Sequence, residues 1–135
     1  MSTLAQQPAL IEGIRSEIPD VIAVYLFGSA AAGELRPDSD IDLAVLLVAP
    51  QPAARLWSLA QSLAVSVGRD VDLIDLRSTS TVMQAQVIST GKRLYCADEP
   101  RCGEFEDRVY SDYARLNEER RHILGDIRER GHIYG

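Results

Sequence analysis

The feature of the sequence that most constrains its fold is a pair of aspartates, Asp40 and Asp42, at the start of a short apolar run. The run extends to Val48 and is rich in apolar and β-branched residues, which favour strands. Because side chains alternate between the two faces of a strand, both aspartates project from one face, and Ile41 and Leu43 project from the other. The pattern predicts a strand that buries one face in the core and carries two neighbouring carboxylates on the opposite face.

Apolar periodicity and turn residues divide the rest of the first 97 residues into short elements. Gly68 stands where a helix would end in a left-handed cap. The order of elements indicates an α/β fold, in which a small mixed β-sheet is flanked by helices. We expect a helix that ends before Pro19, strands at 21–27, 41–48 and 70–76, a turn with at most one helical turn at 28–39, helices at 53–67 and 81–89, and an edge strand at 93–96.

The charge density changes near Ala97. Half of the 34 charged side chains lie in the last 38 residues. We therefore divide the chain into a core, 1–97, and a C-terminal helical extension, 98–135. From Glu104 onward, one apolar stripe marks a long helix, although Arg120 interrupts the stripe and Gly125 weakens the helix. We expect this helix to fold back over the sheet, and the alternative is that part of its face meets a partner. The stripe consists of Phe105, Val109, Tyr113, Leu116, Ile123 and Ile127.

Composition excludes several classes of protein. A net charge of −6 argues against unspecific binding to duplex nucleic acid. The apolar runs are too short to span a bilayer, and no secretory signal is visible, so a cytoplasmic protein is expected. Cys96 and Cys102 have no histidine nearby at ligand spacing, so the sequence indicates neither a zinc site nor a disulfide framework.

A candidate phosphate-binding turn follows the first expected strand. Gly28 stops that strand, and a glycine allows the backbone to approach a ligand closely. Ser29 adds a hydroxyl donor, and a helix start after it would present N–H groups to an anion. By itself such a turn is a weak signal, since most Gly-Ser turns bind nothing.

A third carboxylate comes from the third expected strand. There Asp70 and Asp72 share one face, while Asp75 has the opposite parity. Asp70 stands at the strand entrance beside Arg69, where an exposed ion pair is expected, so Asp72 is the preferred partner of Asp40 and Asp42. These three residues are called the aspartate cluster below. Carboxylate oxygens suit Mg²⁺, which also takes phosphate oxygens and water.

Three carboxylates beside a phosphate-binding turn fit a metal-assisted displacement at phosphorus. In this hypothesis Gly28 and Ser29 bind the triphosphate, and the aspartate cluster binds the metal. Asp72 then takes the proton of the acceptor hydroxyl as general base.

These residues resemble the signature of the DNA polymerase β-type nucleotidyltransferases, in which Gly-Ser is followed by Asp-x-Asp. The sequence around Gly28-Ser29 and Asp40-Ile41-Asp42 is most similar to that of the minimal nucleotidyltransferase branch. The resemblance covers about residues 21–94. The resemblance implies that the chain is the antitoxin of a pair whose toxin is a helical HEPN-type ribonuclease. It also implies that the chain transfers AMP from ATP to a tyrosine of that toxin. It also implies that Asp40 and Asp42 bind both metals and that Asp72 serves the catalytic metal.

One position departs from that branch. Its members often carry Gly-Ser-x-Ala-Arg-Gly, but Ala32 replaces the arginine here, and Arg36 is the nearest substitute in sequence. Two alternatives to protein modification therefore stay open. The chain could be a non-catalytic antitoxin that acts by binding alone, or a nucleotidyltransferase that modifies a small-molecule hydroxyl.

Overall fold

The computed structural model describes residues 3–28, 31 and 40–134. A four-stranded sheet in the order β3-β2-β1-β4 forms its centre. Strands β2 and β3 are parallel, while β1 is antiparallel to both β2 and β4, so the sheet is mixed. The elements in chain order are α1 (Thr3–Glu17), β1 (Ala23–Phe27), β2 (Ile41–Leu46), α2 (Ala53–Val67), β3 (Val71–Asp75), the 3₁₀ helix η1 (Leu76–Ser78), α3 (Thr81–Thr90), β4 (Lys92–Cys96) and α4 (Glu99–Tyr134).

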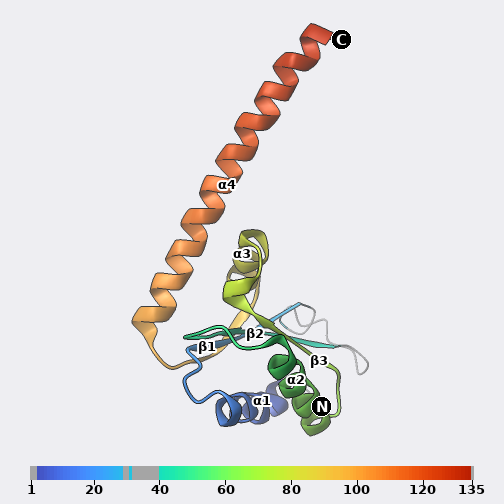
Figure 1. The fold of residues 1–135 in the computed structure, drawn as a ribbon, viewed down its shortest axis with the longest axis vertical. Helices are drawn as coiled ribbons and strands as arrows, with labels where there is room; N and C mark the ends of the chain where they lie inside the picture. The colour runs from blue at the N-terminus through green and yellow to red at the C-terminus, as the bar shows by residue number, and fades with distance from the viewer. Residues whose placement is uncertain (1–2, 29–30, 32–39, 135) are drawn as a thin grey trace.

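Helices cover both faces of the sheet (Figure 1). α1 and α2 pack on one face, where Ile41, Leu43 and Val45 of β2 are fully buried. On the opposite face, Ala44 and Leu46 meet α3 and the first turns of α4. The side-chain alternation predicted for this strand is confirmed. After Asp42, both faces of β2 carry buried core residues.

The expected α/β class is confirmed, including the small mixed sheet, the flanking helices and the long C-terminal helix. α2 has the expected bounds, and Gly68 adopts the left-handed conformation at its end, with φ of 70°. β4 is an edge strand, as predicted. The expected turn at 28–39 falls almost entirely outside the described residues.

Two local bonds determine where α3 and α4 begin. The Ser80 hydroxyl accepts a hydrogen bond from the backbone N–H of Met83, at 3.1 Å. The Asp98 carboxylate accepts one from the N–H of Arg101, at 3.2 Å, so α4 begins at Glu99 rather than near Glu104. Pro100 is tolerated there because the N–H groups of the first helical turn have no partner within the helix.

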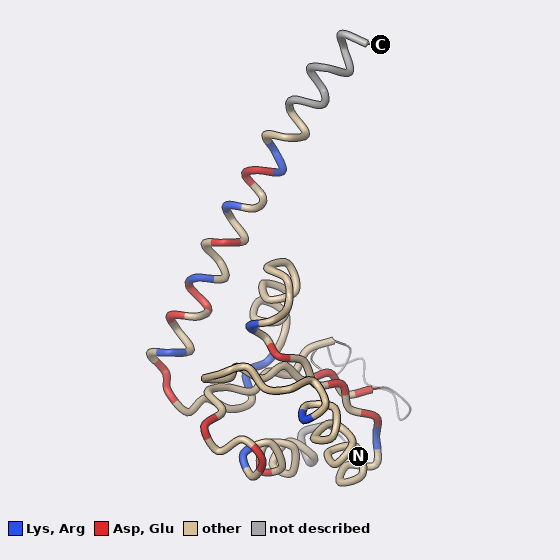
Figure 2. Tube along the Cα trace, viewed as in Figure 1, with Lys and Arg blue, Asp and Glu red and all other residues tan. Residues whose placement is uncertain are grey.

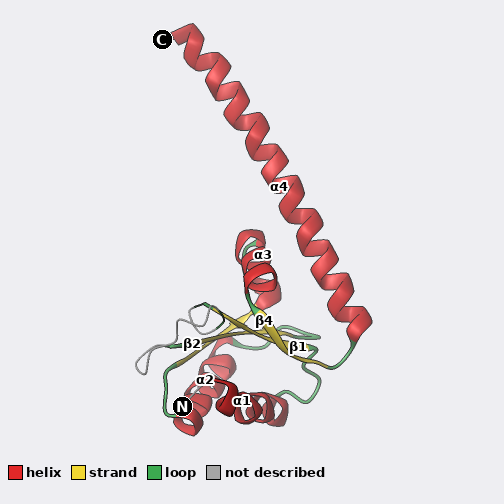
Figure 3. Cartoon of the chain, turned by 180° about the vertical axis from the view of Figure 1, so that it is seen from behind, coloured by secondary structure: helices red, strands yellow, loops and turns green. Residues whose placement is uncertain are grey.

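The expectation that α4 folds back over the sheet is correct only for its beginning. Cys102, Phe105 and Val109 are buried in the core. The remainder of α4 extends away from the sheet, and Figure 3 shows from behind that no other element runs beside its end. Ile123, which was expected on the packed stripe, is 58% exposed. The apolar stripe of α4 therefore packs against the rest of the chain only in its first part.

None of the helices in the described part of the chain is both long and apolar enough to cross a membrane.

Candidate active site

The turn after β1 brings the backbone against a carboxylate of β2. Gly28 has φ of 73°, a conformation that side chains other than that of glycine rarely adopt. A Cβ atom placed on Gly28 would lie 2.3 Å from Oδ2 of Asp42, too close for any real contact. Gly28 is therefore required both for its backbone conformation and for the space that the Asp42 carboxylate occupies. Ser29, the other residue predicted to bind phosphate, lies outside the described residues, as do Ala32 and Arg36.

Strand pairing brings Asp42 and Asp72 together. Asp42 is the second residue of β2 and pairs in register with Asp72 of the parallel strand β3. Residues paired in this way project from the same face of a sheet, so the two carboxyl groups are neighbours. Asp42 is half-buried, and Asp72 is exposed. Asp40 precedes β2 directly and is also exposed, two residues before Asp42.

The electrostatics of Asp42 reflect this crowding. Burial raises the pKa of the Asp42 carboxyl above its ordinary value, and the negative charges of Asp72 and Asp40 raise it further. All three members of the aspartate cluster therefore interact, with Asp42 at the centre. A positive charge placed among them would relieve the repulsion.

Asp70 and Asp75, the two other aspartates of the third expected strand, lie at its two ends and away from Asp42. The Asp75 carboxylate accepts hydrogen bonds from the N–H of Arg77, at 3.1 Å, and from the hydroxyl of Ser78, at 3.0 Å. It thus caps η1 at the far end of β3. Asp70 accepts a backbone hydrogen bond from Ile41, at 2.9 Å, and its side chain is exposed at the strand entrance. Asp72 is the aspartate of β3 that stands beside Asp42.

The donor chemistry of the cluster fits magnesium. Carboxylate oxygens are hard ligands, and Mg²⁺ in proteins is usually held by one or two carboxylates together with substrate phosphates and water. Among the described residues, no group of three or more His, Cys, Asp and Glu side chains is placed so that it could hold a metal ion, and this includes the aspartate cluster. A bound nucleotide would have to supply part of the coordination, as substrate phosphates usually do for Mg²⁺.

A groove runs along the outer edge of the sheet, with Asp72 among its lining residues, on the face opposite to the one from which the Asp72 carboxylate projects. It has a volume of about 320 Å³ and lies between α2 and β3. Trp57 lines it and is 67% exposed, although a tryptophan normally buries much of its ring. Trp57 is not among the residues predicted from the sequence. The signal was present, because Trp57 falls beside the buried stripe of α2, which consists of Leu56, Leu59, Ala60 and Leu63.

Comparison with known families agrees with this geometry. Residues 10–100 match the family model described as polymerase beta, nucleotidyltransferase, which spans the sheet and every member of the aspartate cluster. The chain belongs to this family. The nucleotidyltransferase class expected from the Gly-Ser and Asp-x-Asp spacing is thereby confirmed.

Known relatives indicate which branch of the nucleotidyltransferase family this chain resembles. The chain is 40% identical over 118 residues to the protein adenylyltransferase MntA of Shewanella oneidensis, covering 87% of this chain and 84% of that protein. A crystal structure of a toxin–antitoxin with AMP-PNP matches with a TM-score of 0.81 and 39% identity, over 90% of this chain and 97% of that one. A structure of the tri-AMPylated HEPN toxin of Shewanella oneidensis in complex with MNT antitoxin matches with a TM-score of 0.77 and 37% identity, over 94% and 98%.

Proposed function

We propose that this nucleotidyltransferase uses Mg²⁺ to transfer AMP from ATP to a tyrosine hydroxyl of a HEPN-type ribonuclease toxin, and that it acts as the antitoxin of that toxin. The observation that carries the proposal is the pairing of Asp42 with Asp72 against the Gly28 turn. The same proposal places the protein in the cytoplasm, where ATP is available.

The aspartate cluster is proposed to hold the metal. When bound there, Mg²⁺ neutralises charge on the triphosphate and lowers the pKa of the attacking hydroxyl. Gly28 and Ser29 are proposed to contact the phosphates, because the turn presents backbone to a ligand without a Cβ in the way. ATP as the nucleotide is supported by the AMP-PNP in the toxin–antitoxin relative.

Asp72 is the candidate general base. Its side chain is exposed, so an acceptor hydroxyl can approach it from solvent. In the proposed step the acceptor oxygen bonds to the α-phosphorus, the bond to the bridging oxygen breaks, and pyrophosphate leaves. Asp72 takes the proton of the acceptor hydroxyl.

The C-terminal extension, 98–135, is proposed to bind the toxin. The exposed part of α4 carries acidic and basic residues along its length (Figure 2), with Ile123 and Leu124 exposed among them. Apolar side chains within a charged surface are typical of an interface with a polar rim. A HEPN toxin as the partner is supported by the toxin–antitoxin relatives.

A second candidate function is inhibition by binding alone. Ala32 favours it, because the arginine that members of the resembled branch often carry there would offer a fork of donors to phosphates. The intact aspartate cluster favours catalysis. A small-molecule acceptor, the third hypothesis, is disfavoured because α4 extends away from the sheet (Figure 1) and Asp72 is left exposed rather than enclosed.

Transfer of label from α-³²P nucleotides tests the proposal. Purified chain and purified toxin are incubated with each of the four labelled triphosphates, with Mg²⁺ or with EDTA. We expect label on the toxin only with ATP and Mg²⁺, and none when Asp42→Asn replaces the wild type. Equal labelling from all four triphosphates would remove ATP as the specific substrate. A stable complex without label would favour the binding-only antitoxin.

A further inference from the structure

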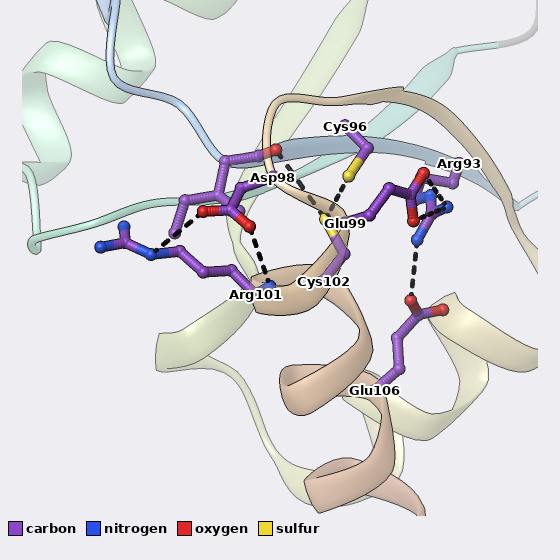
Figure 4. Close-up of polar contacts among 8 residues, drawn as sticks. Arg93, Cys96, Asp98, Glu99, Arg101, Cys102 and Glu106 are labelled. Carbon is purple, nitrogen blue, oxygen red and sulfur yellow. Dashed lines mark hydrogen bonds and ion pairs between the residues drawn. The ribbon is translucent and has the colours of Figure 1, made fainter.

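The two cysteines of the chain meet at the corner between β4 and α4. Cys96 is the last residue of β4, and Cys102 lies in the first turn of α4. Their sulphur atoms are 2.7 Å apart (Figure 4), and both are free thiols. Cys102 is fully buried, while Cys96 is half-buried. The spacing in sequence indicated no shared site, because the contact depends on the turn of the chain from strand to helix.

Several bonds besides the sulphur contact hold this corner in shape. The N–H of Ala97 donates to the carbonyl of Ile22, at 2.8 Å, which fixes the chain directly after Cys96. Asp98 caps the start of α4, as described above. Arg93 of β4 forms ion pairs with Glu99, at 2.9 Å, and with Glu106, at 3.0 Å, both on α4 (Figure 4). The two sulphur atoms are therefore presented to each other by a fixed backbone on either side.

We propose that Cys96 and Cys102 form a reversible disulfide, a redox modification site that joins β4 to the first turn of α4. A disulfide bond measures about 2.0 Å, so closing it requires the two sulphur atoms to approach by about 0.7 Å. In intracellular proteins such bonds are usually transient and redox-sensing rather than structural. The site is distinct from the aspartate cluster and does not depend on the proposed function.

The bond forms by thiol–disulfide exchange with a low-molecular-weight disulfide such as oxidised glutathione. The Cys96 thiolate attacks one sulphur of the reagent, which gives a mixed disulfide and releases one glutathione. Cys102 then attacks the sulphur of Cys96 and releases the second. Two electrons pass from the protein to the reagent, and the two protons of the cysteine thiols end on the two glutathione molecules.

Geometry sets the order of these two steps. Cys96 is half-buried and keeps some exposed surface, whereas Cys102 has none. Burial also raises the pKa of the Cys102 thiol to about 12, so it is a poor nucleophile toward an external reagent. Once Cys96 carries the glutathione, Cys102 is already beside the sulphur that it must attack, and proximity compensates for its low reactivity.

The disulfide would close a short loop across the corner from which α4 leaves the sheet. Of the α4 residues buried in the core, Cys102 is the first. Tying it to β4 restricts the direction in which the exposed part of α4 extends. Oxidation should therefore raise the midpoint of thermal unfolding of the wild-type chain.

The test is to incubate the reduced full-length chain in buffers of increasing oxidised-to-reduced glutathione ratio, to quench with acid, and to measure intact mass and free thiols. We expect the mass to fall by two hydrogen atoms with loss of both thiols, a digest fragment that links Cys96 to Cys102, and full reversal by dithiothreitol. Two free thiols throughout, or a chain-to-chain disulfide in place of the internal one, would overturn the proposal.

Two variants test the order of the steps. Cys102→Ser keeps the accessible thiol and lacks the second one, so we expect it to accumulate a stable glutathione adduct. Cys96→Ser keeps only the buried thiol and should stay unmodified, and circular dichroism checks that each variant is folded. An adduct on Cys102 in the Cys96→Ser variant, with none on Cys96 in the other, would overturn the assignment of Cys96 as the sulphur attacked first.

Discussion

Asp42 and Asp72 lie side by side on neighbouring parallel strands, at paired positions and on one face of the sheet. Burial and the charge of Asp72 are the two largest causes that raise the pKa of Asp42. Such an arrangement costs stability unless a cation is present, which is the physical ground for the proposed metal site. Predictions about the site follow from this pair and from the glycine that makes room for it.

Gly28→Ala should abolish nucleotide transfer. The added Cβ would meet the Asp42 carboxylate at 2.3 Å, and the left-handed backbone at this position costs alanine about 1–2 kcal/mol of folding stability. Gly68→Ala is the matched control, since Gly68 has φ of 70° but no atom within 4 Å of an added Cβ. Activity assays and urea unfolding should show similar destabilisation in both variants and loss of activity only in the first. Full activity in Gly28→Ala would contradict the contact with Asp42.

Asp72→Ala and Asp75→Ala should have opposite effects, although both residues lie on β3. Asp72 is exposed and its charge repels that of Asp42, so its loss should remove transfer without lowering the free energy of unfolding. Asp75 caps η1, so its loss should cost about 1 kcal/mol of stability and preserve transfer. Calorimetric unfolding and the labelling assay separate the two effects. Retained transfer in Asp72→Ala would exclude Asp72 as the base.

Asp42→Asn should raise the melting temperature in metal-free buffer. Because the pKa of Asp42 is raised in the folded state, its ionised form destabilises the fold at neutral pH, and asparagine removes that charge. Added Mg²⁺ should stabilise the wild type by binding to the folded state, and should stabilise Asp42→Asn less. Asp70→Asn, an exposed residue outside the cluster, is the control that should behave like the wild type. An equal Mg²⁺ response in wild type and Asp42→Asn would place the metal elsewhere.

Replacing Ile123 and Leu124 together by glutamine should weaken the toxin complex without unfolding the chain. Both side chains are more than half exposed on the part of α4 that extends from the core. Loss of two apolar anchors commonly weakens an interface about tenfold or more, while exposed substitutions change folding stability by about 0.5 kcal/mol or less. Val65→Gln, an exposed apolar residue of α2, is the control for hydrophobic loss as such. Calorimetric titration with the toxin measures the dissociation constant of the complex. An unchanged dissociation constant for the double variant would exclude this part of α4 from the toxin interface.

The sequence was sufficient to predict the elements whose signals are local. The bounds of α2 follow from apolar spacing and Gly68, and the face shared by Asp40 and Asp42 follows from strand parity. Parity and position also placed Asp72 on that face ahead of Asp75, and the structure gives Asp75 a separate capping role. The bounds of α2 and the alternation along β2 are confirmed because each depends on a few consecutive residues, whereas the position of Asp72 beside Asp42 depends on how β2 and β3 pair.

Features that depend on how the elements pack against one another could not be predicted from the sequence. The apolar stripe on α4 does not indicate where the helix leaves the core, since Val109 and Ile123 look equivalent in the sequence, yet one is buried and the other exposed. The contact between Cys96 and Cys102 depends on the corner between β4 and α4, and the groove at Trp57 depends on how α2 crosses β3. The point where α4 leaves the core and the cysteine contact have no local signal, whereas the only local sign of the groove is the position of Trp57 beside the buried stripe of α2.

The most direct test of the central claim is the intact mass of the toxin after co-expression with this chain. The proposed function predicts that the toxin gains mass in whole adenylyl units with the wild type, on a tyrosine located by peptide mapping, and gains none with Asp42→Asn. A toxin that keeps its unmodified mass in a stable complex with the wild-type chain, or that gains the same mass with Asp42→Asn, would contradict the assignment of the aspartate cluster as the active site.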